Sequence, residues 1–344
     1  MIEVCVVISF RNETERLLWT LDGFAEQRLP DDVAIRVRVG GDGCSPPEFR
    51  PEKPDGRIRF EMFSLPRGGA AVVRNHLLKR VNSDVVIFVN ADTRPDKDFV
   101  SAHVKRLLSL PEGSMVLGNS PYEASPHRTV FDVLKEDSPM IFFYDRLKPN
   151  QFYDYRYSWT LNLSVRHSDF KRAGGFTTAL RPYGYEDLDI AFKIMGEKPA
   201  IYYDPAAAVT HRHPMTLDDY FDREETIGSV APNLSRVNPQ VFQSLFGTRN
   251  LDAVAGDYRV WTSMDFASHR WTYQRLSEWA NEPQTILGAE GSEHRRRLLL
   301  TLYQMHIPLK RLAFRLGFLR GLDLMDDSRW QERGCKGLWR EAIK

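Results

Sequence analysis

The sequence is poor in cysteine, and the three cysteines it has are far apart. Cys5, Cys44 and Cys335 show neither the spacing of zinc ligands nor a disulfide framework. This argues against a zinc-binding module and against a small disulfide-stabilised secreted domain. It favours a reducing, cytoplasmic setting.

Long apolar runs are also missing. No stretch approaches the roughly 20 apolar residues that span a bilayer. The first residues, MIEVCVVISF, form a short apolar run preceded by an acid instead of a basic segment, so we expect no signal peptide. The net charge of +1 gives no indication of nucleic-acid binding. The 344 residues, 42% hydrophobic and 27% charged, predict an ordinary soluble protein with one large domain plus an addition, or two domains.

Two common nucleotide-binding loops are absent as well. The sequence contains no GxGxxG and no GxxxxGK[ST], so neither a dinucleotide-binding loop nor a P-loop is supported. Gly68 and Gly69 do precede a predicted helix, an arrangement that can hold a phosphate.

Strand and helix patterns alternate in the first part of the chain. The strand patterns are β-branched apolar runs or alternating runs, and the helix patterns have apolar residues at helical spacing. The predicted strands are 4–10, 34–39, 57–64 and 85–89, and the predicted helices are 13–27 and 69–81. This order predicts an α/β fold with a mostly parallel sheet.

Polar segments follow three of these strands. FRNE, GGDG and NADT stand at the carboxyl ends, where parallel sheets bind their ligands. Asp92 of NADT suits a turn or helix cap. It also suits a ligand of a hard divalent cation, which takes oxygen donors and bridges a carboxylate and a diphosphate.

The rest of the chain is less regular. Residues 119–157 are rich in proline and aromatic residues and predict an irregular, substrate-specific insertion. Further strands are expected at 115–118, 158–165, 201–203 and 206–211. After Pro214 the chain is expected to be mainly helical, over 216–228, 269–280 and 294–320.

Three segments together resemble the family 2 glycosyltransferases, which use nucleotide sugars and have the GT-A fold. They are VVISFRNE, then RGGAAVVRNHLLKRVNSDVVIFVNADT at 67–93, and GGFTTALRPYGYEDLDIAFKI at 174–194. The resemblance implies a Rossmann-like catalytic domain over residues 1–213, with a nucleotide-binding half to about residue 95 and an acceptor half after it. Residues 214–344 form a helical C-terminal region outside the resemblance.

The resemblance implies that Asp92 holds the metal on the donor diphosphate. Asn90 replaces the first aspartate of the family motif, and its amide can still bond a ribose hydroxyl. Gly41 replaces one of two adjacent acids, and Arg11 replaces an aromatic residue that stacks on the base, as an arginine plane also can. The implied nucleotide-sugar-binding residues are Ser9, Phe10, Arg11, Glu13, Asp42, Arg74, Asn90, Ala91 and Asp92. Asp42 could instead serve only a turn, and Arg74 could lie on a solvated helix face.

Glu186 and Asp187 begin a predicted helix after the aromatic turn PYGY. Acids there can simply favour the helix dipole, by about 0.3–1 kcal/mol. With the GGF segment upstream, we interpret Asp187 as the general base that deprotonates the acceptor hydroxyl. Glu186 then binds an acceptor hydroxyl or orients the base, and Asp189 points elsewhere on the helix.

The segment THRH follows a short predicted strand. A lone histidine is usually structural, but the resemblance implies a further metal ligand here. His211 fits this role better than His213, because it directly follows the apolar strand. Histidine with carboxylate and phosphate oxygens suits Mn²⁺, with Mg²⁺ as the other choice.

Residues 294–320 contain seven Lys or Arg and no acid. One interpretation is a helical pair, broken before Pro308, that packs on the catalytic domain with its charges solvated. A second is a peripheral contact with an anionic membrane, and a third is a homodimer contact.

The sequence therefore predicts an inverting glycosyltransferase of the hexosyltransferase type. It would use Mn²⁺ or Mg²⁺ to move a sugar from a nucleotide-diphosphate donor to a glycan or lipid-linked acceptor in surface polysaccharide or glycoconjugate biosynthesis. Its predicted place is the cytoplasm, or the inner face of the membrane. The alternative is a degenerate GT-A module that binds nucleotide sugar or glycan without catalysis. A nucleotidyltransferase would explain Asp92 but not the Glu-Asp pair.

Overall fold

The computed structural model describes residues 1–264, 266–325 and 337–343, so Cys335 lies outside the described residues. The chain forms two compact units. The first consists of Met1–Glu123, Leu147–Arg181 and Glu186–His213; the second consists of Ala124–Arg146, Pro182–Tyr185 and Pro214–Lys344. Two segments that precede residue 214 thus belong with the C-terminal helices.

The first unit is built on an eight-stranded sheet in the order β3-β2-β1-β4-β8-β6-β9-β7. The strands are β1 (Ile2–Phe10), β2 (Val33–Asp42), β3 (Ile58–Leu65), β4 (Val85–Asn90), β6 (Met115–Gly118), β7 (Phe152–Tyr153), β8 (Asn162–Arg166) and β9 (Ile201–Asp204). Parallel pairs join β1 to β2 and β4, β2 to β3, and β6 to β9. Strand β8 runs antiparallel to β4 and β6, and β7 runs antiparallel to β9.

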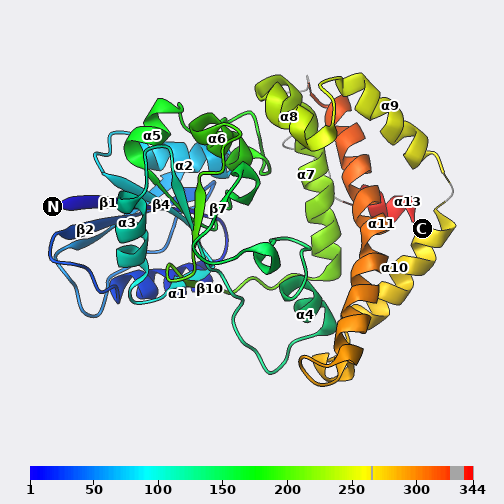
Figure 1. Ribbon diagram of the computed structural model, residues 1–344, viewed down its shortest axis with the longest axis horizontal. Helices are drawn as coiled ribbons and strands as arrows, with labels where there is room; N and C mark the ends of the chain where they lie inside the picture. Colours follow the sequence, from blue (N-terminus) through cyan, green and yellow to red (C-terminus); the bar gives the residue numbers. More distant parts are fainter. Residues whose placement is uncertain (265, 326–336, 344) are drawn as a thin grey trace. The chain divides into compact units, whose positions relative to one another are not determined.

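Helices lie on both faces of this sheet (Figure 1). They are α1 (Thr14–Ala25), α2 (Ala70–Leu78), α3 (Phe99–Ser109), α5 (His167–Arg172) and α6 (Glu186–Met195). Because both faces are covered, the central strands contain continuous apolar runs, residues 4–8 in β1 and residues 85–89 in β4, as predicted. One face packs on α1 and α3, where the rings of Phe24 and Phe99 meet edge to face at 5.9 Å. The predicted α/β class with a mostly parallel sheet and a helical C-terminal part is confirmed.

The predicted strand at 158–165 begins only at Asn162, and the segment 119–157 is not wholly irregular. It contains α4 (Val130–Glu136), the short helices η1 (Tyr144–Arg146) and η2 (Tyr155–Tyr157), and β7. The prediction of an irregular insertion is therefore wrong for these elements. Helix α4 begins with a capping box. The Thr129 hydroxyl accepts from the Asp132 amide at 3.2 Å, and the Asp132 carboxylate accepts from the Thr129 amide at 3.0 Å.

The second unit is helical. Besides α4 and η1 it contains α7 (Leu217–Val237), α8 (Pro239–Phe246), α9 (Leu251–Thr262), α10 (Ala267–Ala280), η3 (Gln284–Leu287), α11 (Glu293–Asp323) and α13 (Leu338–Ala342). Helices α7 and α11 lie side by side (Figure 1). Their backbones are so close that a Cβ on Gly317 would stand 1.9 Å from the Glu225 carbonyl oxygen. No helix among the described residues has the length and apolar character needed to cross a membrane.

The predicted break before Pro308 does not occur. Helix α11 is 31 residues long and contains Pro308 in its interior. A proline inside a helix removes one backbone hydrogen bond and leaves the carbonyl four residues earlier without its donor. Pro308 and Gln304 are both exposed, so water can solvate that carbonyl. The buried residues of α11 that pack in the core of the second unit, such as Leu309 and Leu312, continue past the proline.

Candidate active site

Asp92 lies two residues beyond the end of β4 and is 5% exposed. A second, two-stranded sheet, made of β5 (Thr93–Pro95) and β10 (Val209–His211), brings the THRH segment to it. The His213 Nδ1 atom lies 2.7 Å from Asp92 Oδ2, and the His211 Nε2 atom lies 3.5 Å from the same oxygen. The small sheet thus brings residues that are more than one hundred positions apart in the sequence into one polar cluster.

Asp92, His211 and His213 each offer a ligand atom, and these atoms lie within 4.8 Å of one another. The Asp92 Oδ1 atom is buried and has no hydrogen-bond partner among the described residues. Burial alone would raise the pKa of the Asp92 carboxyl, but the hydrogen bonds and charges of His211 and His213 hold this pKa well below its usual range. A carboxylate with an unused buried oxygen beside two imidazoles is chemically suited to a divalent cation.

His213 was passed over in the sequence-based prediction, which chose His211 alone. In the structure both histidines face Asp92, and their rings stack with centroids 5.4 Å apart. The spacing could have indicated this, because residues two apart on an extended segment point to the same side.

Neighbouring side chains hold the histidine segment in place. The ring of Tyr122 stacks on His211 at 4.9 Å, and the Arg212 guanidinium donates two hydrogen bonds of 2.6 Å to Glu123. The carbon of that guanidinium lies over the ring of Trp19, 4.2 Å from its centre. Arg212 is therefore a positioning residue between the two imidazoles.

The end of β1 lies beside the end of β4. Ser9 pairs in register with Asn90 on one side and with Gly40 on the other. The Phe10 side chain is 3% exposed in the core, so it cannot contact a nucleotide as we predicted, and only its backbone is available. Arg11 is exposed and free to lie against a base.

Glu13 lies in the electrostatic field of the Asp92 cluster. Burial raises the pKa of Glu13 and the charge of Asp92 adds to this effect, whereas Arg16, 2.8 Å away, and His213 lower it. Glu13 is therefore close enough to influence the cluster. Ala91 directly follows β4, and its carbonyl oxygen accepts a hydrogen bond of 3.0 Å from the Thr20 hydroxyl.

Asp42 holds the glycine loop before α2. Its Oδ1 atom accepts from the amides of Gly68 at 2.6 Å and Gly69 at 3.0 Å, so the turn role that we left open accounts for this oxygen. Gly41 has no room for a side chain, because a Cβ there would stand 2.1 Å from the Cys44 carbonyl oxygen. This contact explains why only one acid stands in the segment.

Arg74 is 4% exposed, so the solvated helix face we considered is wrong. Its Nη1 atom lies 3.4 Å from Asp187 Oδ1 and 3.6 Å from Glu186 Oε1. The guanidinium carbon lies 5.5 Å from the centre of the Phe176 ring. Arg74 thus connects the second sequence segment with the third.

Asn75, next along α2, fixes the GGF segment through its side-chain amide. Its Oδ1 accepts from the Phe176 amide at 3.0 Å, and its Nδ2 donates to the Phe176 carbonyl at 2.8 Å. Gly175 has φ of 77°, and a Cβ on it would lie 2.9 Å from this amide oxygen. These contacts explain why Arg-Asn and Gly-Gly-Phe occur in the same chain.

Asp187 is the more accessible acid of the pair, with 23% of its side chain exposed against 8% for Glu186. Thr160 donates to it twice, from its amide at 3.1 Å and from its hydroxyl at 2.8 Å. Burial raises the pKa of Asp187, and this effect outweighs the lowering by Arg74 and Thr160. Asp189 is fully buried and bonded to Thr177 at 2.6 Å, as expected for a residue outside the site.

The first unit is therefore a GT-A-like α/β domain with a carboxylate-histidine cluster and a separate acid pair. Residues 5–159 match the sequence profile described as Glycosyl transferase family 2. The Pre-mycofactocin glycosyltransferase of two Mycobacterium tuberculosis strains is 25% identical over 253 residues, which cover 69% of this chain and 48% of that protein. The predicted resemblance to the family 2 glycosyltransferases is thereby confirmed, and the residues that match the family profile make up less than half of the chain.

The chain spans about half the length of these curated relatives. Among solved structures, TarS of S. aureus has a TM-score of 0.45 at 14% identity, with 92% of this chain and 55% of that chain covered. Its fragment 1–349 has the same TM-score at 12% identity, with 96% and 93% covered. At this TM-score the two structures add nothing to the assignment.

Proposed function

We propose that this protein is a metal-assisted, inverting glycosyltransferase. It moves a hexosyl group from a nucleotide-diphosphate sugar to a hydroxyl of a glycan or lipid-linked acceptor. The observation that carries the proposal is the unpartnered, buried Oδ1 of Asp92 beside His211 and His213, at the ligand-binding edge of the sheet.

Asp92, His211 and His213 are the residues that would hold Mn²⁺ or Mg²⁺. When bound, the cation neutralises charge that develops on the leaving diphosphate. Arg212 and Tyr122 keep the imidazoles facing Asp92 in its absence. Histidine ligands favour Mn²⁺ over Mg²⁺, which prefers oxygen donors.

Ser9, Arg11 and Asn90 serve the donor nucleotide. Ser9 and Asn90 share one register at the carboxyl ends of β1 and β4, where a ribose can reach both. The Asn90 amide offers an acceptor and a donor to a ribose hydroxyl without adding negative charge beside the phosphates. Asp42 acts indirectly, by holding the loop at Gly68 and Gly69.

Asp187 serves the acceptor. Its carboxylate takes the proton of the acceptor hydroxyl while that oxygen forms a bond to the anomeric carbon. The bond from this carbon to the diphosphate oxygen breaks, and its electron pair leaves with the nucleotide. One displacement inverts the anomeric configuration. The raised pKa of Asp187 strengthens it as a base, and Thr160 and Arg74 fix its direction.

The test is a panel of nucleotide sugars screened by thermal shift and by nucleotide diphosphate release, with Mn²⁺ and with chelator. We expect one donor to raise the melting temperature, and to do so only when Mn²⁺ is present. A ligand at 100 times its Kd adds roughly 2.7 kcal/mol to the free energy of unfolding. We also expect transfer to an added glycan or lipid-linked acceptor. Binding that is indifferent to metal, without hydrolysis or transfer, would contradict the proposal and favour the degenerate binding module that the substitution at Asn90 suggests.

A further inference from the structure

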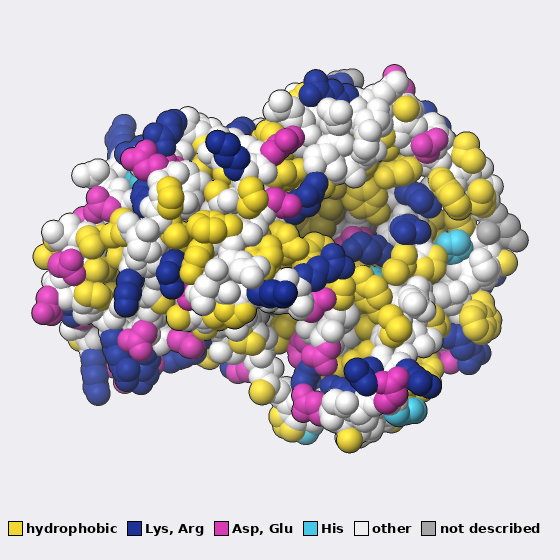
Figure 2. All heavy atoms as spheres, viewed as in Figure 1, with side chains coloured by type: hydrophobic (Ala, Val, Ile, Leu, Met, Phe, Trp, Pro, Cys, Tyr) yellow, Lys and Arg dark blue, Asp and Glu magenta, His cyan; other side chains and the backbone are white. Residues whose placement is uncertain are grey.

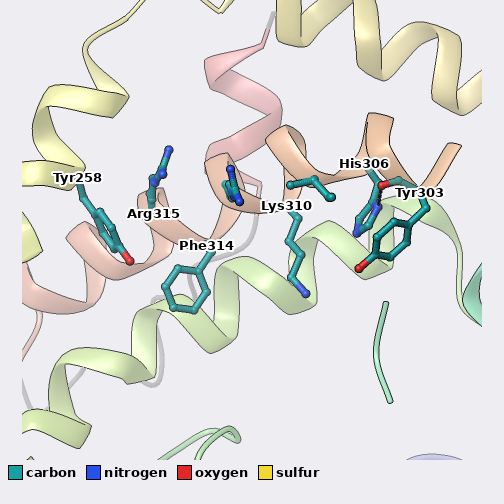
Figure 3. A pocket seen from close by; sticks show the side chains of 8 residues that line it. Tyr258, Tyr303, His306, Lys310, Phe314 and Arg315 are labelled. Carbon is teal, nitrogen blue, oxygen red and sulfur yellow. Dashed lines mark hydrogen bonds between the residues drawn. The ribbon is translucent and has the colours of Figure 1, made fainter. Parts of the chain in front are cut away.

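The second unit contains an open cavity of about 390 Å³ whose lining is basic and aromatic (Figure 3). Seven of its eight lining residues come from α11, and Tyr258 comes from α9. On α11 they form two neighbouring ridges with a spacing of four residues. The ridges are Tyr303, Ile307, Arg311 and Arg315, and His306, Lys310 and Phe314.

Three cations line this cavity, and acids do not balance them. Lys310 lies 3.5 Å from Glu224, but that carboxylate also accepts from Arg223 at 2.6 Å. Arg311 is exposed and forms no ion pair with any residue in the described ranges. The cavity therefore carries a net positive charge.

Arg315 is held in place by rings. Its guanidinium carbon lies 4.8 Å from the ring centre of Trp261 and 5.5 Å from that of Tyr258. Burial lowers the pKa of Arg315, Tyr258 acts in the opposite direction, and the neighbouring positive charge of Arg311 lowers this pKa further. An anion placed here would relieve that repulsion.

The remaining wall offers flat apolar surface with polar tips. Tyr258, Tyr303 and Phe314 present rings, and neither tyrosine hydroxyl has a hydrogen-bond partner among the residues that the structure describes. His306 stays neutral above mildly acidic pH, because burial lowers its pKa to about 4. On the face shown in Figure 2, Lys and Arg side chains lie among hydrophobic ones over α11.

We propose that this cavity binds a phosphate ester. The phosphate lies against Lys310, Arg311 and Arg315, and the sugar or lipid part of the ester lies against Tyr258, Tyr303 and Phe314. Guanidinium groups bind phosphate through paired hydrogen bonds, which favours phosphate over a carboxylate. The further assignment of this ester to the acceptor substrate rests on the proposed function, whereas phosphate binding does not.

The test measures binding of glucose 1-phosphate by calorimetry, without donor or metal. The variant Arg311→Gln/Arg315→Gln is compared with Arg296→Gln/Arg297→Gln, which removes the same charge from exposed positions on the same helix. We expect the first pair to weaken binding by about tenfold or more and the second to leave it nearly unchanged. Arg311→Gln alone repeats the test if the loss of Arg315 prevents folding.

A second arm uses vesicles of phosphatidylcholine alone and of equal parts phosphatidylcholine and phosphatidylglycerol. Loss of binding to the anionic vesicles in the Arg311/Arg315 variant would support the site with a lipid as the source of the phosphate. Loss of glucose 1-phosphate binding would support it with a soluble sugar phosphate as the source.

Equal affinity of wild type and the Arg311/Arg315 variant for both probes would overturn the proposal. Equal losses in the two double variants, or tighter binding of glucuronate than of glucose 1-phosphate, would also overturn it. Metal-dependent donor hydrolysis, measured in parallel, separates the two proposals. If donor hydrolysis persists and the Arg311/Arg315 variant binds both probes as well as the wild type does, only the cavity proposal fails. If donor hydrolysis is absent and the cavity residues are needed to bind a probe, only the enzymatic proposal fails.

Discussion

Two aspartates in the first unit occupy opposite chemical environments. Asp92 is nearly inaccessible, yet two histidines hold its pKa below the usual range. Asp187 keeps 23% of its side chain exposed and has an arginine beside it, yet burial holds its pKa above the usual range. The difference teaches that exposure and the number of hydrogen bonds do not by themselves decide the direction of a pKa shift. The direction depends on whether the neighbours outweigh burial, as His211 and His213 do at Asp92 and as Arg74 and Thr160 do not at Asp187.

This contrast divides the work between the two groups. A carboxylate with a lowered pKa stays ionised and suits a cation. One with a raised pKa can accept a proton during the reaction. The predictions below test whether this division holds.

The largest effect is expected from Asp187→Asn. It removes the base but keeps the shape, so transfer should fall roughly 100- to 10,000-fold. The affinity for the nucleotide diphosphate with Mn²⁺ should not change. Steady-state transfer kinetics and calorimetry measure the two quantities.

Glu197→Gln, an exposed acid just beyond α6, is the control and should keep both properties. Transfer at the wild-type rate by Asp187→Asn would remove Asp187 from the role of base.

A somewhat smaller loss is expected from Asp92→Asn, about 100- to 1,000-fold in donor turnover, because stabilisation of the leaving charge is reduced. Chelation of the wild type should reproduce this loss, and addition of Mn²⁺ should restore the wild type but not the variant. Asp98→Asn removes a 67%-exposed carboxylate nearby and should behave as wild type. Full activity of Asp92→Asn at the Mn²⁺ concentration that saturates the wild type would contradict the assignment of Asp92 as a metal ligand.

Replacing either histidine compares the ligand predicted from sequence with the one found in the structure. His211→Ala and His213→Ala should each raise the Mn²⁺ concentration for half-maximal activity by about tenfold or more. His269→Ala, in the second unit, is the matched control. An effect of His211→Ala without an effect of His213→Ala would return the site to the two-residue prediction.

The smallest effect concerns pH. Transfer should fall as the pH drops through the raised pKa of Asp187, because the base becomes protonated. The Thr160 hydroxyl stabilises the ionised form, so Thr160→Val should raise this pKa further and move the acidic limb of the rate profile to higher pH. A profile that stays in place while the rate falls would mean that Thr160 only positions the helix.

Much of the first unit follows from local pattern. The apolar run before Asn90 predicts β4, the chain order predicts a parallel sheet, and the polar residues after it mark the ligand edge. Predicting them requires only patterns over a few residues and the order of strands and helices along the chain.

The rest depends on contacts between distant residues. The sequence does not indicate that Cys44 closes the space at Gly41, or that Asp42 is used by the glycine loop. The burial of Arg74 depends on Glu186 and Asp187, more than one hundred residues away. The continuity of α11 depends on packing that outweighs the backbone preference of Pro308.

The most direct test of the central claim is a calorimetric titration of the donor nucleoside diphosphate into the wild type and into Asp92→Asn. Each protein is titrated with Mn²⁺ and with chelator. We predict tight binding only to the wild type with Mn²⁺, and equally weak binding in the other three titrations. Equal affinity of the two proteins in the presence of Mn²⁺ would contradict the claim that Asp92 holds the cation.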